Sequence, residues 1–275
     1  PELRGAAPVT QSLRQQLEEA GANVIVDGIL DIEGKDYIDT GYTEWGASGL
    51  AAVWAENNTR ESIYEAFRRK ETFATSGSRI KVRFFGGYNL EKILEEGDPI
   101  KYAYANASSM GSDILQNQNQ VPEFMVWAMR DLKRAPLDRV QIIKGWTELS
   151  GKPHEKVYDV ACSDGRKANI KTGLCKDSRA KVNLSNCKIS KNFGADELKV
   201  VWKDPDFNPN LKAFYYVRVL ENPTCRWSTW DAIKSGEKPR GDLPSTIQER
   251  AWTSPIWYVP DNDGIEVRNI LPDDV

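Results

Sequence analysis

The sequence predicts an α+β protein in which a short α/β segment precedes an antiparallel β-sandwich of the immunoglobulin type. A strand-like run, a capped helix and a second strand-like run follow one another between residues 49 and 88, the order of an α/β domain. Regularly spaced strand-like runs then follow, separated by Gly, Pro and Asn turns and without a long helix. The predicted boundary lies near residues 78–87, so that residues 1–78 form one domain and residues 79–275 the other.

The first 55 residues contain three predicted elements. Residues 10–20 read as a short helix, because Leu13 and Leu17 are four residues apart. Residues 22–32 are apolar and β-branched, and form either a strand or a buried loop. Residues 49–55 (GLAAVWA) form a continuous apolar run of strand length. Such a run is typical of a strand buried on both faces, as in a parallel sheet.

A helix is predicted directly after this run. Asn58 is the expected N-cap, and Glu61 stands three residues later, which is the spacing of a capping box. Ile63, Ala66 and Phe67 form the expected inner stripe of the helix.

The remaining elements are predicted to be strands. In the run AFYYVRVLE, Tyr215, Val217 and Val219 fall on one face. The predicted strands cover residues 79–88, 100–107, 123–131, 139–149, 155–161, 197–204, 213–221 and 254–259.

Composition narrows the class of protein. The chain has 275 residues, of which 40% are hydrophobic, enough for a substantial core. Its net charge of -3 does not favour nucleic acid as a partner. No apolar run approaches the length that a membrane-spanning helix requires, so we expect no membrane span in this chain. Because the chain begins at Pro1 and not at methionine, we expect a piece of a longer protein, with any signal peptide upstream.

The histidine count limits the metal chemistry. Zinc and iron sites of hydrolases use several imidazoles, and this sequence has one histidine, His154. We therefore assign no catalytic residue and no metal ligand to this chain. A carboxylate site for Mg²⁺ or Ca²⁺ stays open.

Four cysteines favour an oxidising compartment. Cys162, Cys175, Cys187 and Cys225 form no C-x-x-C pair, and three of them flank or lie within a polar loop over residues 163–192. Of the three possible pairings, we favour Cys175 with Cys187 and Cys162 with Cys225. The alternative is four free thiols in a cytosolic protein.

Two polar segments are candidates for binding a substrate. The turn TSGSR, which ends at Arg79, has hydroxyls, a glycine and a cation that could hold an anion. Glu56, Asn57 and Arg60 follow the run 49–55, where substrate loops of barrel enzymes lie. The alternative for each segment is a plain connection or a helix cap.

Tryptophans and an acidic run supply two weaker candidates. Sugars stack on exposed aromatic rings, and the aromatic side chains of interest lie in CRWSTWDA and ERAWTSPIWY. They are Trp227, Trp230, Trp252, Trp257 and Tyr258. The alternative is a large aromatic core.

The acidic run KDPDFNPN places Asp204, Asp206 and Asn208 at alternate positions, as at the start of a calcium loop. Pro205 and Pro209 favour instead a rigid turn.

Long segments of the chain resemble a known family. They include GLAAVWAENNTRESIYEAFRRKETFATSGSRIKVRFFGG, VQIIKGW, HEKVYDVACSDG, VWKDPDFNPNLKAFYYVRVLENPTCRWSTWDA and ERAWTSPIWY. Over residues 49–258 the sequence resembles the bacterial "domain of unknown function 3604" family. That family is similar to the PHP (polymerase and histidinol phosphatase) metallohydrolases, whose distorted β/α barrel binds two or three metal ions.

The resemblance implies a division of the chain and a function. Residues up to about 77 would be the last β/α unit of a PHP-like barrel, followed by the sandwich. The family's His-x-His and Asp-x-His metal ligands do not occur here. The implied protein is an exported phosphoesterase-like hydrolase. Its N-terminal barrel portion would hold a divalent metal (Zn, Mn or Fe), act on a small ester or phosphoester and partner this chain, which alone would be inactive.

Two other functions remain as alternatives. The sandwich is either a non-catalytic module that binds carbohydrate or protein, or a purely architectural domain. The binding module requires exposed tryptophans, and burial of Trp227, Trp230 and Trp252 would exclude it. In each case the expected location is periplasmic or secreted.

Overall fold

The computed structural model describes residues 29–32, 35–38, 48–118, 120–190 and 192–261. The chain divides into two compact units, one of residues 1–47 and 226–245 and the other of residues 48–225 and 246–275. Each unit is considered by itself below.

The first unit contains a hairpin and a helix. β1 (Ile29–Ile32) pairs antiparallel with β2 (Lys35–Ile38). The helix α4 (Trp227–Ser235) ends at Gly236, whose φ of 74° is in the left-handed region that glycine adopts readily. The predicted helix over residues 10–20 lies outside the described residues, as does the first part of the run 22–32.

The second unit is built from two sheets. The larger has the order β10-β9-β14-β17-β4-β3, with β18 beside β14 and β7 beside β18. Its strands are β3 (Leu50–Val53), β4 (Thr72–Thr75), β7 (Asp113–Leu115), β9 (Leu137–Thr147), β10 (Pro153–Cys162), β14 (Ala213–Glu221), β17 (Arg250–Thr253) and β18 (Ile256–Val259). The smaller has the order β13-β8-β5-β6 and contains β5 (Lys81–Gly87), β6 (Ser108–Ser109), β8 (Glu123–Met129) and β13 (Glu197–Lys203).

These strands pair antiparallel throughout, except β18 with β7. Two further pairs lie apart from the two sheets: β11 (Val182–Asn183) with β12 (Lys188–Ile189), and β15 (Thr224–Cys225) with β16 (Thr246–Ile247). The described chain is therefore a sheet-rich α+β fold.

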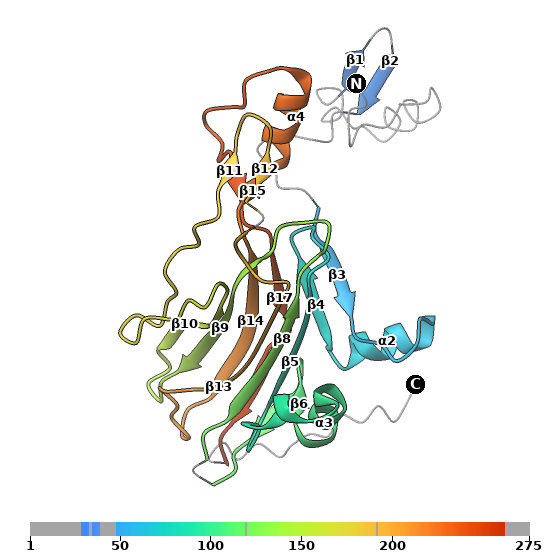
Figure 1. Ribbon diagram of the computed structural model, residues 1–275. Coiled ribbons are helices and arrows are strands. Elements are labelled where there is room, and N and C mark those ends of the chain that lie inside the picture. Colours follow the sequence, from blue (N-terminus) through green and yellow to red (C-terminus); the bar gives the residue numbers. More distant parts are fainter. Residues whose placement is uncertain (1–28, 33–34, 39–47, 119, 191, 262–275) are drawn as a thin grey trace. The chain divides into compact units, whose positions relative to one another are not determined.

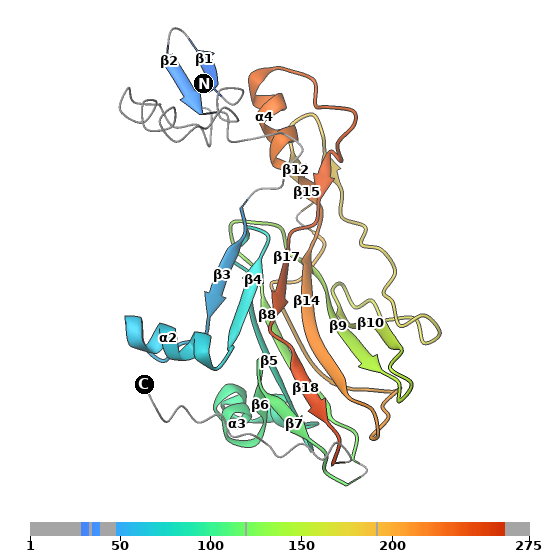
Figure 2. The ribbon, with the colours of Figure 1, turned by 180° about the vertical axis from the view of Figure 1, so that it is seen from behind.

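The core lies between the two sheets, which face each other in Figures 1 and 2. Tyr215, Val217 and Val219 of β14 are fully buried, which confirms the face predicted from their alternation. From the smaller sheet, Phe124 places its ring 4.3 Å from that of Tyr215. The outer face of the smaller sheet has its own apolar cluster, in which Phe85 and Met125 pack with residues of the following helical segment.

The predicted helix exists as α2 (Arg60–Arg68), but its cap and inner face differ from the prediction. Thr59, and not Asn58, is the N-cap, since its hydroxyl accepts from the backbone N–H of Ser62. Ala66 is buried as predicted, whereas Phe67 is 51% exposed. The helix therefore presents part of its apolar stripe outward.

The prediction of a strand over residues 100–107 is wrong. This segment forms the helix α3 (Pro99–Asn106), preceded by the single 3₁₀ turn η2 (Ile93–Glu95). Asp98 caps α3 by accepting from the backbone N–H of Lys101, and Pro99 stands in its first turn. Both are helix-start signals that outweigh the alternation of the following apolar residues.

The prediction that the run 49–55 is a strand buried on both faces is also wrong. β3 lies at the end of the large sheet and pairs antiparallel with β4, although α2 stands between them in the chain. Leu50 is 43% exposed. The described residues form no β/α barrel; whether residues 1–78 belong to a separate domain stays a prediction.

The four cysteines form two disulfides, with a pairing that differs from the one we favoured. Cys162 pairs with Cys175 and Cys187 pairs with Cys225, with Cα atoms 6.3 and 5.6 Å apart. The loop over residues 169–175 lies along β10, since Asp159 N donates to Gly173 O at 2.8 Å, and this brings Cys175 to the end of that strand. Two disulfides are consistent with an oxidising compartment. No helix in the described ranges has the length and apolarity that crossing a bilayer requires.

Candidate functional site

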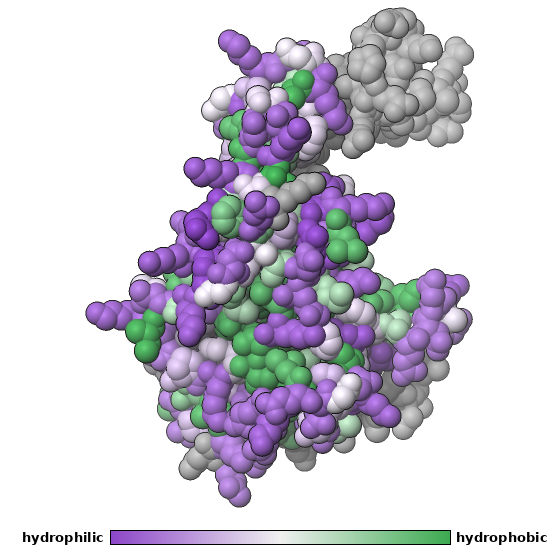
Figure 3. All heavy atoms as spheres, viewed as in Figure 1, coloured by the Kyte–Doolittle hydropathy of each residue, from purple (hydrophilic) through white to green (hydrophobic). Residues whose placement is uncertain are grey.

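Two exposed aromatic side chains of the second unit lie close together on α2. Tyr64 and Phe67 are 58% and 51% exposed, and with Arg60, Glu61 and Ile63 they line an open hollow of about 450 Å³. These five residues are called the α2 surface below. In Figure 3 the region of this helix, at the right of the view, is mainly hydrophilic, with a few apolar atoms next to it. Exposed apolar side chains that lie together make this surface a candidate for contact with a partner.

The loop that leads from β3 into α2 is fixed by an aromatic cluster. The indole of Trp54 donates to Val82 O at 2.8 Å, and the guanidinium of Arg83 lies 3.7 Å from its ring centroid. Arg83 also donates to the hydroxyl of Tyr104 at 2.7 Å, and that hydroxyl donates to Glu71. Burial and the bond to Glu71 raise the pKa of Tyr104 to about 12. The chain segments on either side of α2 are thus held on β5 and α3.

The predicted substrate residues fall into two places. Glu56, Asn57 and Arg60 are exposed and lie together in the loop after β3 and the first turn of α2. Arg79 lies at the other end of β3, because the turn before it packs against Ser48 and Gly49. The structure therefore brings three of the four residues together and leaves Arg79 apart.

The turn that ends at Arg79 faces carboxylates. Ser76 hydrogen-bonds Glu249, and the backbone N–H of Arg79 donates to Asp131 at 3.0 Å. Burial acts to raise the pKa of Asp131, but the N–H groups of Lys133 and Arg79 outweigh it and hold the pKa below its ordinary value. Carboxylates around the turn repel an anion, so the contacts favour a connection and not an anion cradle.

Beside this turn, the carboxyl of Glu221 is fully buried. Neither of its oxygens has a hydrogen-bond partner by geometry among the described residues. Burial raises its pKa to about 8, and the hydroxyl of Ser78 counteracts part of that rise. Sequence reasoning missed this residue, because an acidic side chain at a strand end ordinarily faces water.

The acidic run 203–210 forms a turn held by lysines. Asp204 is fully buried and accepts from Lys144 at 2.6 Å and from Tyr215 at 2.7 Å. Asp206 accepts from Lys156 and from Tyr158, and the bond from Lys156 is the main reason that its pKa is lowered. Both carboxylates are thus neutralised by lysines, which favours the rigid turn over a calcium loop.

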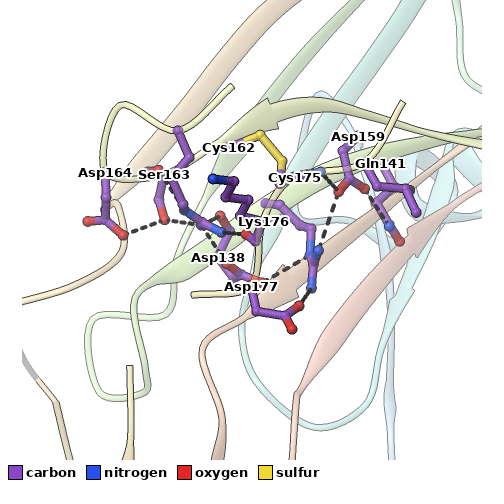
Figure 4. The surroundings of a disulfide bond; sticks show 12 residues. Asp138, Gln141, Asp159, Cys162, Ser163, Asp164, Cys175, Lys176 and Asp177 are labelled. Carbon is purple, nitrogen blue, oxygen red and sulfur yellow. Dashed lines mark hydrogen bonds and ion pairs between the residues drawn. A yellow bond between two sulfur atoms is a disulfide. The ribbon is translucent and has the colours of Figure 1, made fainter. Parts of the chain in front are cut away.

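A second buried polar network lies beside the disulfide Cys162–Cys175 (Figure 4). Asp159 accepts from the backbone N–H of Cys175 and from Gln141, both at 2.6 Å. Asp138 forms an ion pair with Arg139 at 3.0 Å and accepts a hydrogen bond from Arg166 at 2.6 Å. Because every carboxylate oxygen here has a partner, the network anchors the loop 163–192 to the sheet.

The predicted aromatic residues belong to two different units. Trp227 and Trp230 belong to the first unit, with Trp230 39% exposed. In the second unit, Tyr258 is buried in the core, while Trp257 is 46% exposed and Trp252 is half-buried. The burial that would exclude a binding module is therefore not found.

His154 is a structural residue on β10. Its ring stacks on Trp146 at 5.1 Å, and its Nε2 lies 2.6 Å from Glu148. Within the described ranges, no three His, Cys, Asp or Glu residues are arranged to hold a metal ion.

Comparison with known protein families identifies a family for this chain. The model described as "Protein of unknown function (DUF3604)" matches residues 9–260. No curated protein and no solved structure matches the chain.

Proposed function

The chain belongs to the DUF3604 family of proteins of unknown function, and on that premise we propose that it is the C-terminal portion of an exported, metal-dependent hydrolase. The substrate is a phosphate ester or a related ester, attacked by a metal-bound water. The metal, Zn, Mn or Fe, is held by an N-terminal, PHP-like barrel portion of the same protein. The present chain adds the last β/α unit of that barrel and an immunoglobulin-like sandwich, and acts in the periplasm or outside the cell.

One observation carries this proposal: an unpaired strand edge lies beside an exposed apolar helix. Within the described residues β3 pairs with β4 alone, so its other edge is open. Leu50 on this strand and Tyr64 and Phe67 on α2 are each more than 40% exposed. Open apolar edges are ordinarily paired or covered, because they template pairing with another chain segment. We assign this edge and the α2 surface to contact with the barrel portion.

In this arrangement the loop after β3 lies at the junction with the catalytic portion. Arg60 offers a guanidinium that can bind a phosphate in a bidentate way, and Glu56 and Asn57 add polar contacts. Trp54 and Arg83 fix the loop, so these side chains are presented on a rigid support.

The full-length protein, including the segment upstream of this chain, tests the proposal. We expect metal in the purified protein by elemental analysis, and hydrolysis of at least one of p-nitrophenyl phosphate, bis-p-nitrophenyl phosphate and p-nitrophenyl acetate. A protein that binds none of the three metals and cleaves none of these esters would end the proposal.

A matched pair of arginines tests the position of the site. Arg60 and Arg68 are both exposed arginines of α2, at its opposite ends. Arg60→Ala should raise KM, with kcat/KM falling about tenfold or more, since a charge-assisted hydrogen bond contributes about 1.5–3 kcal/mol. Arg68→Ala should leave kcat/KM unchanged. Equal effects of the two variants would remove Arg60 from the site.

A further inference from the structure

A second surface, independent of the proposed hydrolase, lies on the outer side of the large sheet. Because Tyr215, Val217 and Val219 point into the core, the residues between them on β14 point outward. Trp252 lies opposite Arg218, and Trp257 opposite Phe214. We call this surface the Trp252 face; it consists of Phe214, Tyr216, Arg218, Arg250, Trp252 and Trp257. In Figure 2 this side of the sheet faces the viewer.

One end of the Trp252 face is an aromatic platform. The ring of Phe214 lies 5.1 Å from that of Trp257 and 6.4 Å from that of Tyr216. Phe214 also lies directly over Gly145 of β9, where an added Cβ would stand 2.2 Å from its ring. A glycine at this position lets the ring lie on the backbone of β9. Trp257 is 46% exposed, so the platform is open to a ligand.

The other end of the face is basic. Arg218 uses its Nε to donate to Gln141 at 2.7 Å, and Arg250 uses its Nε to donate to Gln248 O at 3.1 Å. Within the described residues, no hydrogen bond or ion pair involves the terminal guanidinium nitrogens of either arginine. Arg250 lies 6.0 Å from the Trp252 ring, and Arg218 is opposite it on β14. The indole of Trp252 thus lies between the guanidinium groups of Arg218 and Arg250, whose terminal N–H groups are available to a ligand.

Acidic side chains lie at the aromatic end. Glu155 of β10 and Asp113 of β7 are in register with the Phe214 and Trp257 positions, and both are exposed. From the row of Phe214 to that of Arg250, which pairs with Leu220, the face extends about 20 Å at ~3.3 Å per residue. That length accommodates a short chain of rings, with anionic groups at the basic end and hydroxyl donors at the acidic end.

We propose that the Trp252 face binds an acidic oligosaccharide, whose carboxylates or sulfates pair with Arg218 and Arg250 while its sugar rings stack on the aromatic side chains. The apolar face of a pyranose ring suits an aromatic ring, and guanidinium groups pair bidentately with carboxylates and sulfates.

Two other kinds of partner fit the face less well. A protein partner would need an apolar centre, but the aliphatic side chain of Ile143 on this side is 1% exposed. Single-stranded nucleic acid also stacks on aromatic rings, but the chain has a net charge of -3, and its two disulfides indicate an oxidising compartment.

Isothermal titration of the intact chain tests the proposal, with tetragalacturonate and a heparin-derived tetrasaccharide as acidic probes. Cellotetraose and oligothymidylate are the comparison ligands, at an ionic strength of about 0.15 M to limit non-specific attraction. We expect millimolar or tighter binding of at least one acidic probe and at least tenfold weaker binding of both comparison ligands. No binding of either acidic probe, or equal or tighter binding of cellotetraose or oligothymidylate, would overturn the proposal.

Variants on the two sheets distinguish specific binding at the Trp252 face from non-specific binding elsewhere on the protein. Trp252→Ala and Arg218→Gln should each weaken binding about tenfold, equivalent to about 1.4 kcal/mol. Trp127→Ala is the matched control, because Trp127 is also an indole with a cation over its ring, Lys199 at 3.8 Å, but lies on the smaller sheet. It should change the affinity less than twofold. Arg218→Lys keeps the positive charge but loses the bidentate geometry of the guanidinium group. It should weaken binding, while circular dichroism should show an unchanged fold. A Trp127→Ala effect as large as that of Trp252→Ala would refute the assignment.

Discussion

Two buried carboxyls lie beside opposite ends of β14, and their surroundings differ. Near its start, Tyr215 and Lys144 both donate to Asp204, which is fully buried. At its end, Glu221 is equally buried, but its oxygens have no hydrogen-bond partner by geometry among the described residues. Burial and Asp204 raise the pKa of Tyr215 well above its ordinary value, and burial raises that of Glu221 to about 8.

The two carboxyls are similarly buried, and the difference between them lies in the partners that surround them. Asp204 has the ammonium group of Lys144 beside it at 2.6 Å as a counter-charge. Glu221 has no such partner, so its burial favours the neutral carboxylic acid. An ion pair therefore lies beside one end of β14, and a carboxyl that is mostly protonated at neutral pH lies at the other.

The largest expected effect comes from breaking the paired end. Asp204→Ala leaves Lys144, whose side chain is 5% exposed, without its counter-charge. We expect a loss of about 3–5 kcal/mol in the free energy of unfolding, measured by urea denaturation.

The neighbouring carboxylate and a double variant serve as controls. Asp206→Ala removes a carboxylate that is 48% exposed, and should cost less than about 1 kcal/mol. Replacing both buried partners, Lys144→Met with Asp204→Leu, should restore much of the stability. A loss below about 1 kcal/mol for Asp204→Ala would mean that the paired end contributes no more than a surface pair.

The unpaired end predicts a dependence of stability on pH. The folded-state pKa of Glu221 is raised from 4.5 to about 8, so folding favours its protonated form. The stability from this group is fully present below pH 4.5 and is lost as the pH rises towards 8. The slope is at most about 1.4 kcal/mol per pH unit. Glu221→Gln should remove this contribution, so that the difference in stability between variant and wild type grows steadily with pH. A constant difference from pH 5 to pH 8 would contradict the raised pKa.

The comparison also separates what local sequence determines from what it does not. The inward face of β14 followed from alternation, because a period of two is a local property of a strand. The pairing of Asp204 with Lys144 joins residues 60 positions apart, and nothing in the run KDPDFNPN indicates it. The same alternating positions therefore resembled a calcium loop. The disulfide pairing failed for the same reason: the course of residues 169–175 along β10 is a long-range feature.

Local signals were also misjudged where two of them competed. The residues after Asp98 and Pro99 alternate like a strand, yet the cap and the proline start a helix. The exposed edge of β3 was not predictable from GLAAVWA. A continuous apolar run occurs both in central strands and in edge strands that pair with another segment, so the run does not distinguish the two. The loop after β3 presents Glu56, Asn57 and Arg60 together because they are consecutive or nearly so, and their role in binding a substrate stays a prediction.

The smallest expected effect comes from the hydroxyl beside the unpaired carboxyl. Ser78 is almost fully buried and acts to lower the pKa of Glu221, so it stabilises the ionised form. Ser78→Ala should therefore leave stability unchanged near pH 5, where Glu221 is neutral in the folded state. Near pH 9, where it is ionised, the variant should be less stable by about 1 kcal/mol.

Ser76→Ala is the matched control for this prediction, because Ser76 lies in the same turn but hydrogen-bonds Glu249. Its effect on stability should be equal at the two pH values. If Ser78→Ala also acted equally at pH 5 and pH 9, its hydroxyl would merely fill space, and Glu221 would be buried without any help from the turn. A pH-dependent difference confined to Ser78 would instead show that this turn, which the sequence presented as an anion site, serves to moderate the charge of a buried carboxyl.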